Sequence, residues 1–446
     1  MKEIKVIGGG LAGCEAAWQA AKRGFLVSLY EMRPYSGTGA HTSGKLAELV
    51  CSNSLGSDLI TRASGLLAEE LREMGSLLLR AADHCKIPAG QALAVDRILF
   101  SEKVETLISN HPRIKVIREE VKQIPEGPTI LASGPLTSNA LSGAIAYFTG
   151  QENLFFFDAL APIIEFDSID MNIAFWGSRY GRGFRDKGDY INCPLTEEDY
   201  NRFVTELINA ERIELRDFEG KINQGVKAGK GNFFEGCLPI EVLAYRGPSS
   251  LAFGPLRPVG IKNPYKNESR PFAIVQLRQD DKQGLLFNMV GFQTNLKHKE
   301  QERVFRLIPG LRNANFVRYG QMHRNTYIFS PDVLRQTLQS KMREDLFFAG
   351  QLCGVEGYLA SIATGLIAGI NISAFLDNGN MLILPEETMI GALITYICRP
   401  EPDYFQPMKA NFGLLPKLDI KIKKKTERYQ AYADRSLEIL KINSIQ

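Results

Sequence analysis

The sequence predicts an α/β fold in which one domain interrupts another. Three observations predict it. The chain opens with a strand, a glycine-rich turn and a helix over residues 2–24, and a second strand follows over 25–31. Two later segments, 129–134 and 345–358, repeat the order of strand and glycine turn. The stretch between these segments has a different texture, with aromatic runs and several strand-like pieces.

The first turn has the spacing Gly8-x-Gly10-x-x-Gly13, and the second strand ends in Glu31, 18 residues after the last glycine. In a dinucleotide site Gly8 permits the tight turn, Gly10 lets the backbone approach a pyrophosphate, and Gly13 lets helix and strand pack closely. The helix N-terminus favours phosphate charge, and Glu31 can accept hydrogen bonds from ribose hydroxyls. A bare glycine motif can be no more than a tight turn, but here strand, helix and acid all stand where the site needs them.

We therefore expect a bound dinucleotide, and the acid after the second strand favours FAD or NAD over NADP. The expected cofactor-binding residues of this unit are Gly8, Gly9, Gly10, Leu11, Ala12, Gly13 and Glu31. The later segment adds Gly350 and Gly357 ahead of a helix from about residue 358 to 375. A flavoprotein needs such a second helix N-terminus to approach the isoalloxazine and stabilise negative charge on reduced flavin. The alternative is a plain strand–helix unit of the same sheet, and both can hold.

The middle of the chain predicts a different kind of domain. A helix opens at Thr196-x-x-Asp199, which is similar to a capping box, and continues with apolar residues at helical spacing. Strand candidates are 272–278 and 285–290. The expected architecture is a Rossmann-like, glutathione-reductase-like FAD-binding domain with an inserted α+β domain. The predicted bounds are 1–155 and 325–446 for the FAD-binding domain and 156–324 for the insertion.

The composition is that of an ordinary globular protein of two or three domains, with 446 residues, 44% hydrophobic and 23% charged. The 53 basic and 50 acidic residues leave a net charge of +3, which argues against a protein that coats nucleic acid by bulk charge. Residues 411–446 hold eight Lys and Arg against four Asp and Glu, a net of +4, so the rest of the chain sums to −1.

Targeting and metal signals are weak. The apolar run near the N-terminus is too short for a signal-peptide core, and polar residues interrupt the longest apolar stretch, 359–376. We therefore expect a cytoplasmic protein without a membrane span. The seven cysteines form no C-x-x-C pair and no cluster with histidine at metal spacing, so we expect reduced thiols and no metal site.

Two cysteines are candidates for chemistry. Cys51 follows the second strand in a polar, turn-prone segment, and Cys237 stands in a loop with glycine and proline flanks. Loop cysteines near polar groups can be activated as thiolates. The structural alternative, a buried small hydrophobe, suits Cys14 and Cys353 better, because helix or glycine-turn sequence surrounds them.

His323 is one of five histidines, and its neighbours Arg324 and Asn325 leave a ligand-facing loop and a structural role equally open. Two basic segments could contact RNA. Residues 179–185 interleave cations with aromatics, and residues 421–425 hold a lysine run. Either segment could instead be a plain solvated face.

In addition, the chain resembles the TrmFO family, the folate- and FAD-dependent tRNA (uracil-5-)-methyltransferases related to the glucose-inhibited division protein. The resemblance runs nearly end to end. It rests on seven runs in the same order, at residues 8–13, 47–55, 89–97, 234–241, 289–294, 320–326 and 354–358.

The resemblance implies an enzyme that takes a methylene group from methylenetetrahydrofolate and forms 5-methyluridine at uridine 54 in the T loop of tRNA. Reducing equivalents would come from NADH or NADPH through FAD, and the expected partners are folate and the tRNA T arm. Cys237 would be the nucleophile, Cys51 would assist proton removal, and His323 would stack on the folate. The chemistry agrees, because uracil C5 is a poor nucleophile until a thiolate adds at C6, and a base must then remove the C5 proton.

Two positions depart from the family pattern. An acid often follows the last glycine–tyrosine run where this chain has Ala360, and a basic residue is usual where it has Ala252. These departures leave open a paralogue that methylates a uridine in 23S ribosomal RNA. Two further alternatives are a flavoprotein oxidoreductase acting on a small molecule, and a flavin-binding partner in tRNA modification without methyl transfer. The pattern does not set the oligomeric state.

Overall fold

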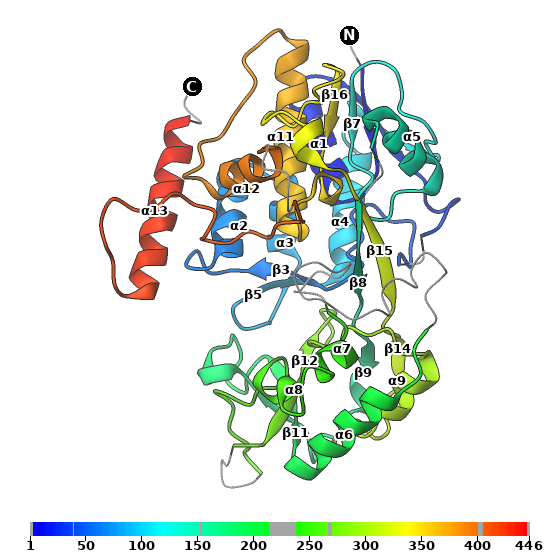
Figure 1. Ribbon diagram of the computed structural model, residues 1–446, viewed down its shortest axis with the longest axis vertical. Coiled ribbons are helices and arrows are strands. Elements are labelled where there is room, and N and C mark those ends of the chain that lie inside the picture. Colours follow the sequence, from blue (N-terminus) through cyan, green and yellow to red (C-terminus); the bar gives the residue numbers. More distant parts are fainter. Residues whose placement is uncertain are drawn as a thin grey trace.

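The computed structural model describes residues 3–38, 40–151, 154–213, 238–265, 270–399 and 405–443, with the backbone alone for 154–158 and 323–324. The first and last parts of the chain together form the upper body in Figure 1, and the middle of the chain forms the lower one. The α/β class and the interrupted arrangement are thus as the sequence predicts, while the residue bounds of the two domains stay a prediction.

A parallel sheet of five strands, in the order β16-β7-β1-β2-β6, is the centre of the upper body. Its strands are β1 Glu3–Ile7, β2 Leu26–Glu31, β6 Ile114–Arg118, β7 Thr129–Leu131 and β16 Leu346–Phe348. The strands predicted near the N-terminus and in the two glycine-turn segments are all confirmed. Because β1, β7 and β16 run parallel, the glycine turns that follow them meet at one edge of the sheet.

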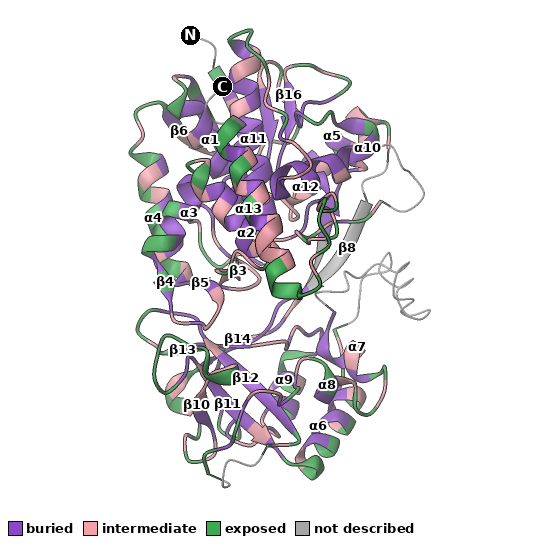
Figure 2. Cartoon of the chain, turned by 90° about the vertical axis from the view of Figure 1, so that its left-hand side faces the viewer, coloured by how far each residue is buried: buried purple, intermediate pink, exposed green. Residues whose placement is uncertain are grey.

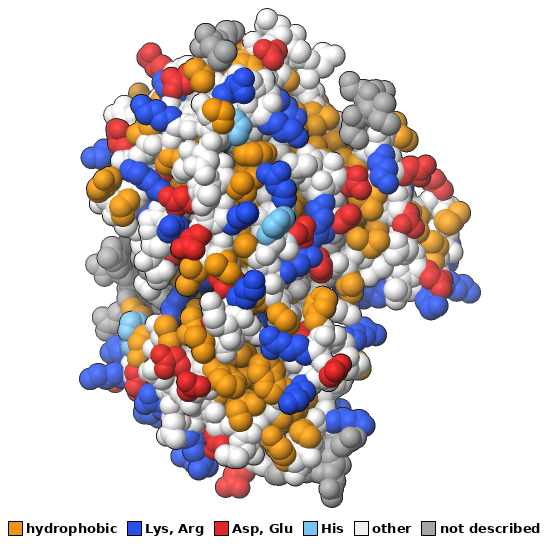
Figure 3. All heavy atoms as spheres, turned by 180° about the vertical axis from the view of Figure 1, so that it is seen from behind, with side chains coloured by type: hydrophobic (Ala, Val, Ile, Leu, Met, Phe, Trp, Pro, Cys, Tyr) orange, Lys and Arg blue, Asp and Glu red, His pale blue; other side chains and the backbone are white. Residues whose placement is uncertain are grey.

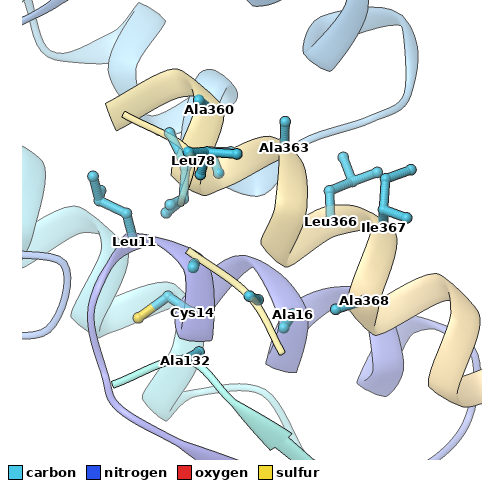
Figure 4. Packing of buried hydrophobic residues seen from close by; sticks show 14 of the residues in the cluster. Leu11, Cys14, Ala16, Leu78, Ala132, Ala360, Ala363, Leu366, Ile367 and Ala368 are labelled. Atoms are coloured by element: carbon cyan, nitrogen blue, oxygen red, sulfur yellow. The ribbon is translucent and has the colours of Figure 1, made fainter. Parts of the chain in front are cut away.

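Two helices lie side by side against this sheet, α1 (Leu11–Lys22) and α11 (Tyr358–Leu376), as Figure 4 shows. Glycines on α11 allow the close approach. A Cβ atom at Gly365 would lie 2.3 Å from the carbonyl oxygen of Ala12, and one at Gly369 would lie 2.6 Å from that of Ala16. In the described part of the chain α11 is the one helix long and apolar enough to cross a membrane, and 78% of that stretch is buried here.

Further helices and short strands surround this pair, and most of their buried residues join one hydrophobic core (Figure 2). The elements before the insertion are β3 Ser54–Ser57, α2 Ala63–Glu73, α3 Leu77–His84, β4 Lys86–Ile87, β5 Ala92–Val95, α4 Arg97–Ser109 and α5 Asn139–Thr149. Those after it are α10 Ser330–Val333, α12 Met389–Cys398 and α13 Lys425–Asn443.

The lower body has its own sheet and a separate hydrophobic core. The sheet is antiparallel, in the order β10-β11-β12-β13-β9-β14. Its strands are β9 Ile163–Glu165, β10 Phe175–Gly177, β11 Tyr190–Leu195, β12 Ala273–Gln279, β13 Leu286–Met289 and β14 Phe316–Arg318. The helices are α6 Glu197–Asn209, α7 Ile240–Ala244, α8 Ser250–Phe253 and α9 His298–Phe305. The predicted strands and the capping box of Thr196 and Asp199 are confirmed.

A two-stranded antiparallel ribbon joins the two bodies. It pairs β8 (Leu154–Ala159) with β15 (Met322–Tyr327), where His323 is opposite Asp158. The interpretation of the His323 segment as a ligand-facing loop is therefore wrong for the backbone, which is a strand. The run Met-His-Arg-Asn-Thr-Tyr lacks hydrophobic alternation, so pairing with β8 rather than a local pattern makes it extended.

Candidate functional site

A cavity of about 490 Å³ opens where the glycine turns after β1, β7 and β16 meet. It brings together segments that are hundreds of residues apart in the chain. Its lining includes Gly8, Gly10, Leu11, Ala12, Glu31, Cys51, Asn325, Gly350, Gly357, Tyr358 and Ala360. The predicted dinucleotide turn, the predicted second glycine turn and one candidate cysteine thus share a single site.

The three glycines of the Gly8-x-Gly10-x-x-Gly13 motif are suited to their positions for different steric reasons. Gly8 has a φ of +109°, and a Cβ there would lie 2.4 Å from the carbonyl oxygen of Ala132. A Cβ at Gly13 would lie 1.8 Å from the carbonyl oxygen of Gly8, so only glycine lets α1 start so close to β1. A Cβ at Gly10 would meet no atom within 4 Å, which leaves the backbone open to a ligand.

Two helix N-termini border the cavity. The residues that precede them, Gly10 for α1 and Gly357 for α11, provide no side-chain cap. The first backbone N–H groups of a helix have no partner within the helix, and the helix dipole adds positive potential there. Two such termini on one cavity fit a flavin dinucleotide, with the α1 terminus suited to the pyrophosphate and the α11 terminus to the flavin ring.

Glu31 lies at the cavity, but its oxygens already have partners. One oxygen accepts from Gly9 N at 3.0 Å and Arg33 Nη2 at 3.2 Å, and the other from Arg33 N and Nε at 3.0 and 2.9 Å. Burial alone would raise the pKa of Glu31, but the bonds and charge of Arg33 hold that pKa below its ordinary value. All four acceptor positions of the carboxylate are thus used, so the predicted ribose contact requires Arg33 to turn aside.

Cys51 lies on a loop that ends against α11. It is half-buried and lines the cavity. The backbone N–H groups of Cys51 and Ser52 donate to the hydroxyl of Tyr358, at 2.8 and 3.1 Å, which fixes the loop to the start of α11. Cys14 and Cys353 are buried, as predicted, and Cys85, Cys193 and Cys398 are buried too. Burial raises the pKa of Cys193 and Cys398 to about 12, so neither thiol is suited to nucleophilic chemistry.

Three arginines that sequence reasoning missed hold the Cys51 loop. Arg97, at the start of α4, donates to the carbonyl oxygen of Leu49 at 2.8 Å, and Arg318 of β14 donates to that of Val50. Arg278 of β12 donates to Ser52 Oγ at 2.6 Å and to Asn53 Oδ1 at 2.9 Å.

Arg97 also pairs with Asp280, with 2.8 Å between Nη2 and Oδ1. In the sequence, Arg97 stood out only as part of the run at 89–97 that carries the family resemblance. Nothing in the sequence around Arg278 or Arg318 indicated a role at the site, because these arginines act across the boundary between the two bodies.

Other predicted residues have varied fates. Cys237 lies outside the described residues, and so do the side chains of His323 and Arg324, so their roles stay predictions. Asn325 is buried and lines the cavity. Ala360, the family departure, lines it too, in the first turn of α11.

The first basic segment is only in part a solvated face. Arg179 is structural, because its guanidinium donates to Gln276 Oε1 and to the carbonyl oxygens of Arg257 and Val259. Tyr180 and Phe184, by contrast, are 65% and 72% exposed, and Arg182 lies over the Tyr180 ring. Seen from behind, the lower body carries a cluster of hydrophobic side chains, with both basic and acidic side chains at its margin (Figure 3). The lysines at 421–425 are mostly exposed, ahead of and at the start of α13.

Comparisons with known proteins show the family of this chain. A family model described as glucose inhibited division protein A matches residues 3–380. The methylenetetrahydrofolate--tRNA-(uracil-5-)-methyltransferase TrmFO of Bacillus pumilus (strain SAFR-032) is 54% identical over 437 residues, which cover 98% of each chain. The protein of that name from Anoxybacillus flavithermus (strain DSM 21510 / WK1) is 53% identical over 438 residues, again 98% of each chain.

Among solved structures, Aquifex aeolicus GidA in its form II crystal matches with a TM-score of 0.68 at 16% identity. The match covers 99% of this chain and 73% of that one, and it shows a shared fold. The dinucleotide turn, the paired helix N-termini, the family model and relatives identical at more than half of their positions all agree: this chain belongs to the TrmFO family, within the glucose-inhibited division protein A group.

Proposed function

We propose that this chain methylates C5 of uridine 54 in the T loop of tRNA, with methylenetetrahydrofolate as the carbon donor and NADH or NADPH as the reductant. The observation that carries the proposal is the cavity in which Cys51 shares walls with both glycine turns. The names of the relatives support the reaction, since they are methylenetetrahydrofolate–tRNA-(uracil-5-)-methyltransferases identical at about half of their positions.

The chemistry assigns separate tasks to the two cysteines. The Cys237 thiolate adds to uracil C6, which makes C5 nucleophilic enough to bond to the folate-derived carbon. Cys51 then takes the C5 proton, and the bond between the new carbon and its carrier nitrogen breaks, which leaves an exocyclic methylene on C5. A hydride equivalent adds to that methylene carbon and expels the Cys237 thiolate from C6, which restores the ring double bond. FAD, when bound, supplies the two electrons that bring the new carbon to the methyl level. The chain holds the reacting atoms together and keeps water out.

The proposed RNA contacts are exposed aromatic side chains with arginines beside them. The target base must leave its stack to reach a cavity this deep, and stacking on aromatic side chains offsets part of that cost. Tyr180 and Phe184, with arginines beside them, are exposed on the lower body and are the proposed contacts. His323, two residues before Asn325 of the cavity wall, is the proposed folate contact.

The experiment supplies purified protein with methylenetetrahydrofolate labelled in its methylene group, total tRNA and ribosomal RNA together, and NADH or NADPH in separate reactions. We expect label in tRNA at uridine 54, loss of labelling in Cys237→Ala with flavin absorbance retained, and normal labelling in Cys398→Ala. Cys398 is the matched control because its thiol is buried in α12 and donates to a backbone carbonyl oxygen away from the cavity.

Each contrary result has a distinct meaning. Full labelling by Cys237→Ala removes the nucleophile assignment, and methylation from S-adenosylmethionine alone removes the folate. Label confined to 23S ribosomal RNA identifies the paralogue. An intact flavin without labelling of either RNA favours an oxidoreductase or a partner protein.

A further inference from the structure

We propose that Arg97, Arg278 and Arg318 are positioning residues that lock the Cys51 loop and keep Cys51 as a thiolate in the resting protein. The use of that thiolate as a base rests on the proposed function, but its existence does not. Two of the three arginines, Arg278 and Arg318, come from the lower body, whereas Cys51 belongs to the upper one.

Hydrogen bonds hold the Cys51 loop along its whole length. The three guanidiniums and the Tyr358 hydroxyl together contact every residue of the loop from Leu49 to Asn53, through a carbonyl oxygen, a backbone N–H or a side-chain oxygen. A guanidinium binds through a planar, rigid set of donors, so several of them fix a loop more firmly than lysines would. The sulfur of Cys51 therefore has little freedom to leave this environment.

Positive charges outnumber carboxylates around the Cys51 loop. Among the described residues, the acidic groups that act most strongly on these arginines are the Asp280 carboxyl, the Cys51 thiol and the phenols of Tyr190 and Tyr358. Asp280 is 3% exposed and pairs with Arg97, whose side chain is 12% exposed. One carboxylate against three guanidiniums leaves an excess of two positive charges, and uncompensated charge in a poorly solvated site is costly.

The neighbouring phenols and Glu48 do not balance this positive charge. Burial, and then the nearby Cys51, raises the pKa of Tyr358 well above its ordinary value, and burial raises that of Tyr190. Both phenols are thus neutral at physiological pH. Glu48, three residues before Cys51, is already held by Arg33, Thr42 and Ser43. Cys51 is the remaining group on this loop that can supply a negative charge, and arginines beside a thiol favour the thiolate.

The test measures the thiolate directly. Cys51 is alkylated with iodoacetamide from pH 5.5 to 10 in a Cys237→Ala background, and labelled peptides are followed by mass spectrometry. The background suits the purpose because the other described cysteines are buried. We expect a midpoint for Cys51 at least one unit below the value of about 8.5 for an ordinary thiol.

Substitution of the arginines separates charge from structure. Arg278→Met and Arg318→Met should each raise the midpoint by about one unit, and the corresponding Lys variants should restore part of the shift. Arg306→Met is the matched control. Its guanidinium also donates to a backbone carbonyl oxygen, of Ala314, on the lower body, but it makes no contact with the loop.

A parent midpoint at or above 8.5, or equal midpoints in all three Met variants, overturns the proposal. If a Met variant fails to fold, the midpoint of the parent protein alone decides the proposal. Methyl transfer is assayed in parallel on protein with Cys237 intact. A low midpoint without RNA labelling refutes the proposed function and leaves this inference standing, and a normal midpoint with RNA labelling does the reverse.

Discussion

The empty space around Gly10 and the crowding around Gly13 are the clearest residue-scale contrast in the site. A Cβ at Gly13 would overlap the carbonyl oxygen of Gly8, whereas one at Gly10 would project into open space. The φ of Gly10 is −78°, which alanine adopts without strain. The two positions thus separate folding from cofactor binding within one motif.

We expect Gly13→Ala to cost about 2 kcal/mol or more in unfolding free energy, because α1 must move away from β1. Gly10→Ala should stay folded but bind FAD at least about tenfold more weakly, since its methyl group takes the place of a phosphate oxygen. Urea unfolding and flavin fluorescence titration measure the two effects.

Gly143→Ala serves as the control for both glycine variants. Gly143 is an exposed glycine of α5, and a Cβ there would also meet no atom within 4 Å. This control should keep full FAD affinity. Unchanged FAD affinity in Gly10→Ala would contradict the proposed pyrophosphate position.

Residue-scale prediction from sequence succeeded where one short motif carries all the information. Gly8 and Gly13 have the packing roles that their spacing predicts, whereas the predicted role of Gly10 in cofactor binding stays a prediction. It missed Arg278 and Arg318, because each acts on a loop more than two hundred residues away, and nothing local marks them. Glu31 is an intermediate case: its place at the cavity is as predicted, but its engagement by Arg33 follows from three-dimensional structure.

At the scale of elements, one buried carboxylate joins three helices. Glu70 of α2 accepts from the first backbone N–H groups of α12, at Met389 and Ile390, with distances of 2.6 and 2.8 Å, and from the Ser436 hydroxyl of α13. Burial raises the pKa of Glu70 to about 7, although these hydrogen bonds oppose the shift. The last helix of the chain is therefore attached through a group that titrates near neutrality.

The sign of the pH effect follows from this shift. The folded state holds the Glu70 proton more tightly than the unfolded chain, in which the pKa of Glu70 has its ordinary value of 4.5. The contribution of this proton to the unfolding free energy is therefore full below pH 4.5 and is lost as the pH rises through about 7. We expect the difference in unfolding free energy between the wild type and Glu70→Gln to fall by up to about 3 kcal/mol from pH 4.5 to 8.

Urea unfolding at both pH values measures this difference. Glu73→Gln, at an exposed position of the same helix, is the control and should show a constant difference. A constant difference for Glu70→Gln as well would show that the pKa of Glu70 is the same in the folded and unfolded states.

Elements with strong local signals were predictable, and elements formed by pairing were not. Helix α6 has both its capping box and its buried stripe written in consecutive residues. Strand β15 has neither, and its geometry comes from β8, more than 160 residues earlier. The glycine face of α11 was likewise hidden, because Gly365 and Gly369 reveal a packing role only beside α1.

On the scale of the whole molecule, two separate hydrophobic cores are joined by the β8–β15 ribbon and by the arginine contacts to the Cys51 loop. The interrupted arrangement could be predicted, because composition and strand pattern change along the chain. The mutual contribution to one site could not, since it depends on how the two bodies meet.

Cofactor binding should affect the two cores differently. FAD at about 100 times its dissociation constant stabilises the part that binds it by about 2.7 kcal/mol. We expect hydrogen exchange to slow by up to about 100-fold in β1, α1 and α11, and to change much less in β11 and β12. Exchange measured by mass spectrometry with and without FAD tests this. Equal protection of both sheets would mean that the molecule unfolds as one cooperative unit.

The hydrogen bonds from the lower body to the Cys51 loop also limit how this site can be transferred to another protein. A related flavin scaffold given only the loop and its cysteine would lack Arg278 and Arg318, and with them the hydrogen bonds that fix the loop here. The smallest portable unit is therefore the loop together with β12 and β14.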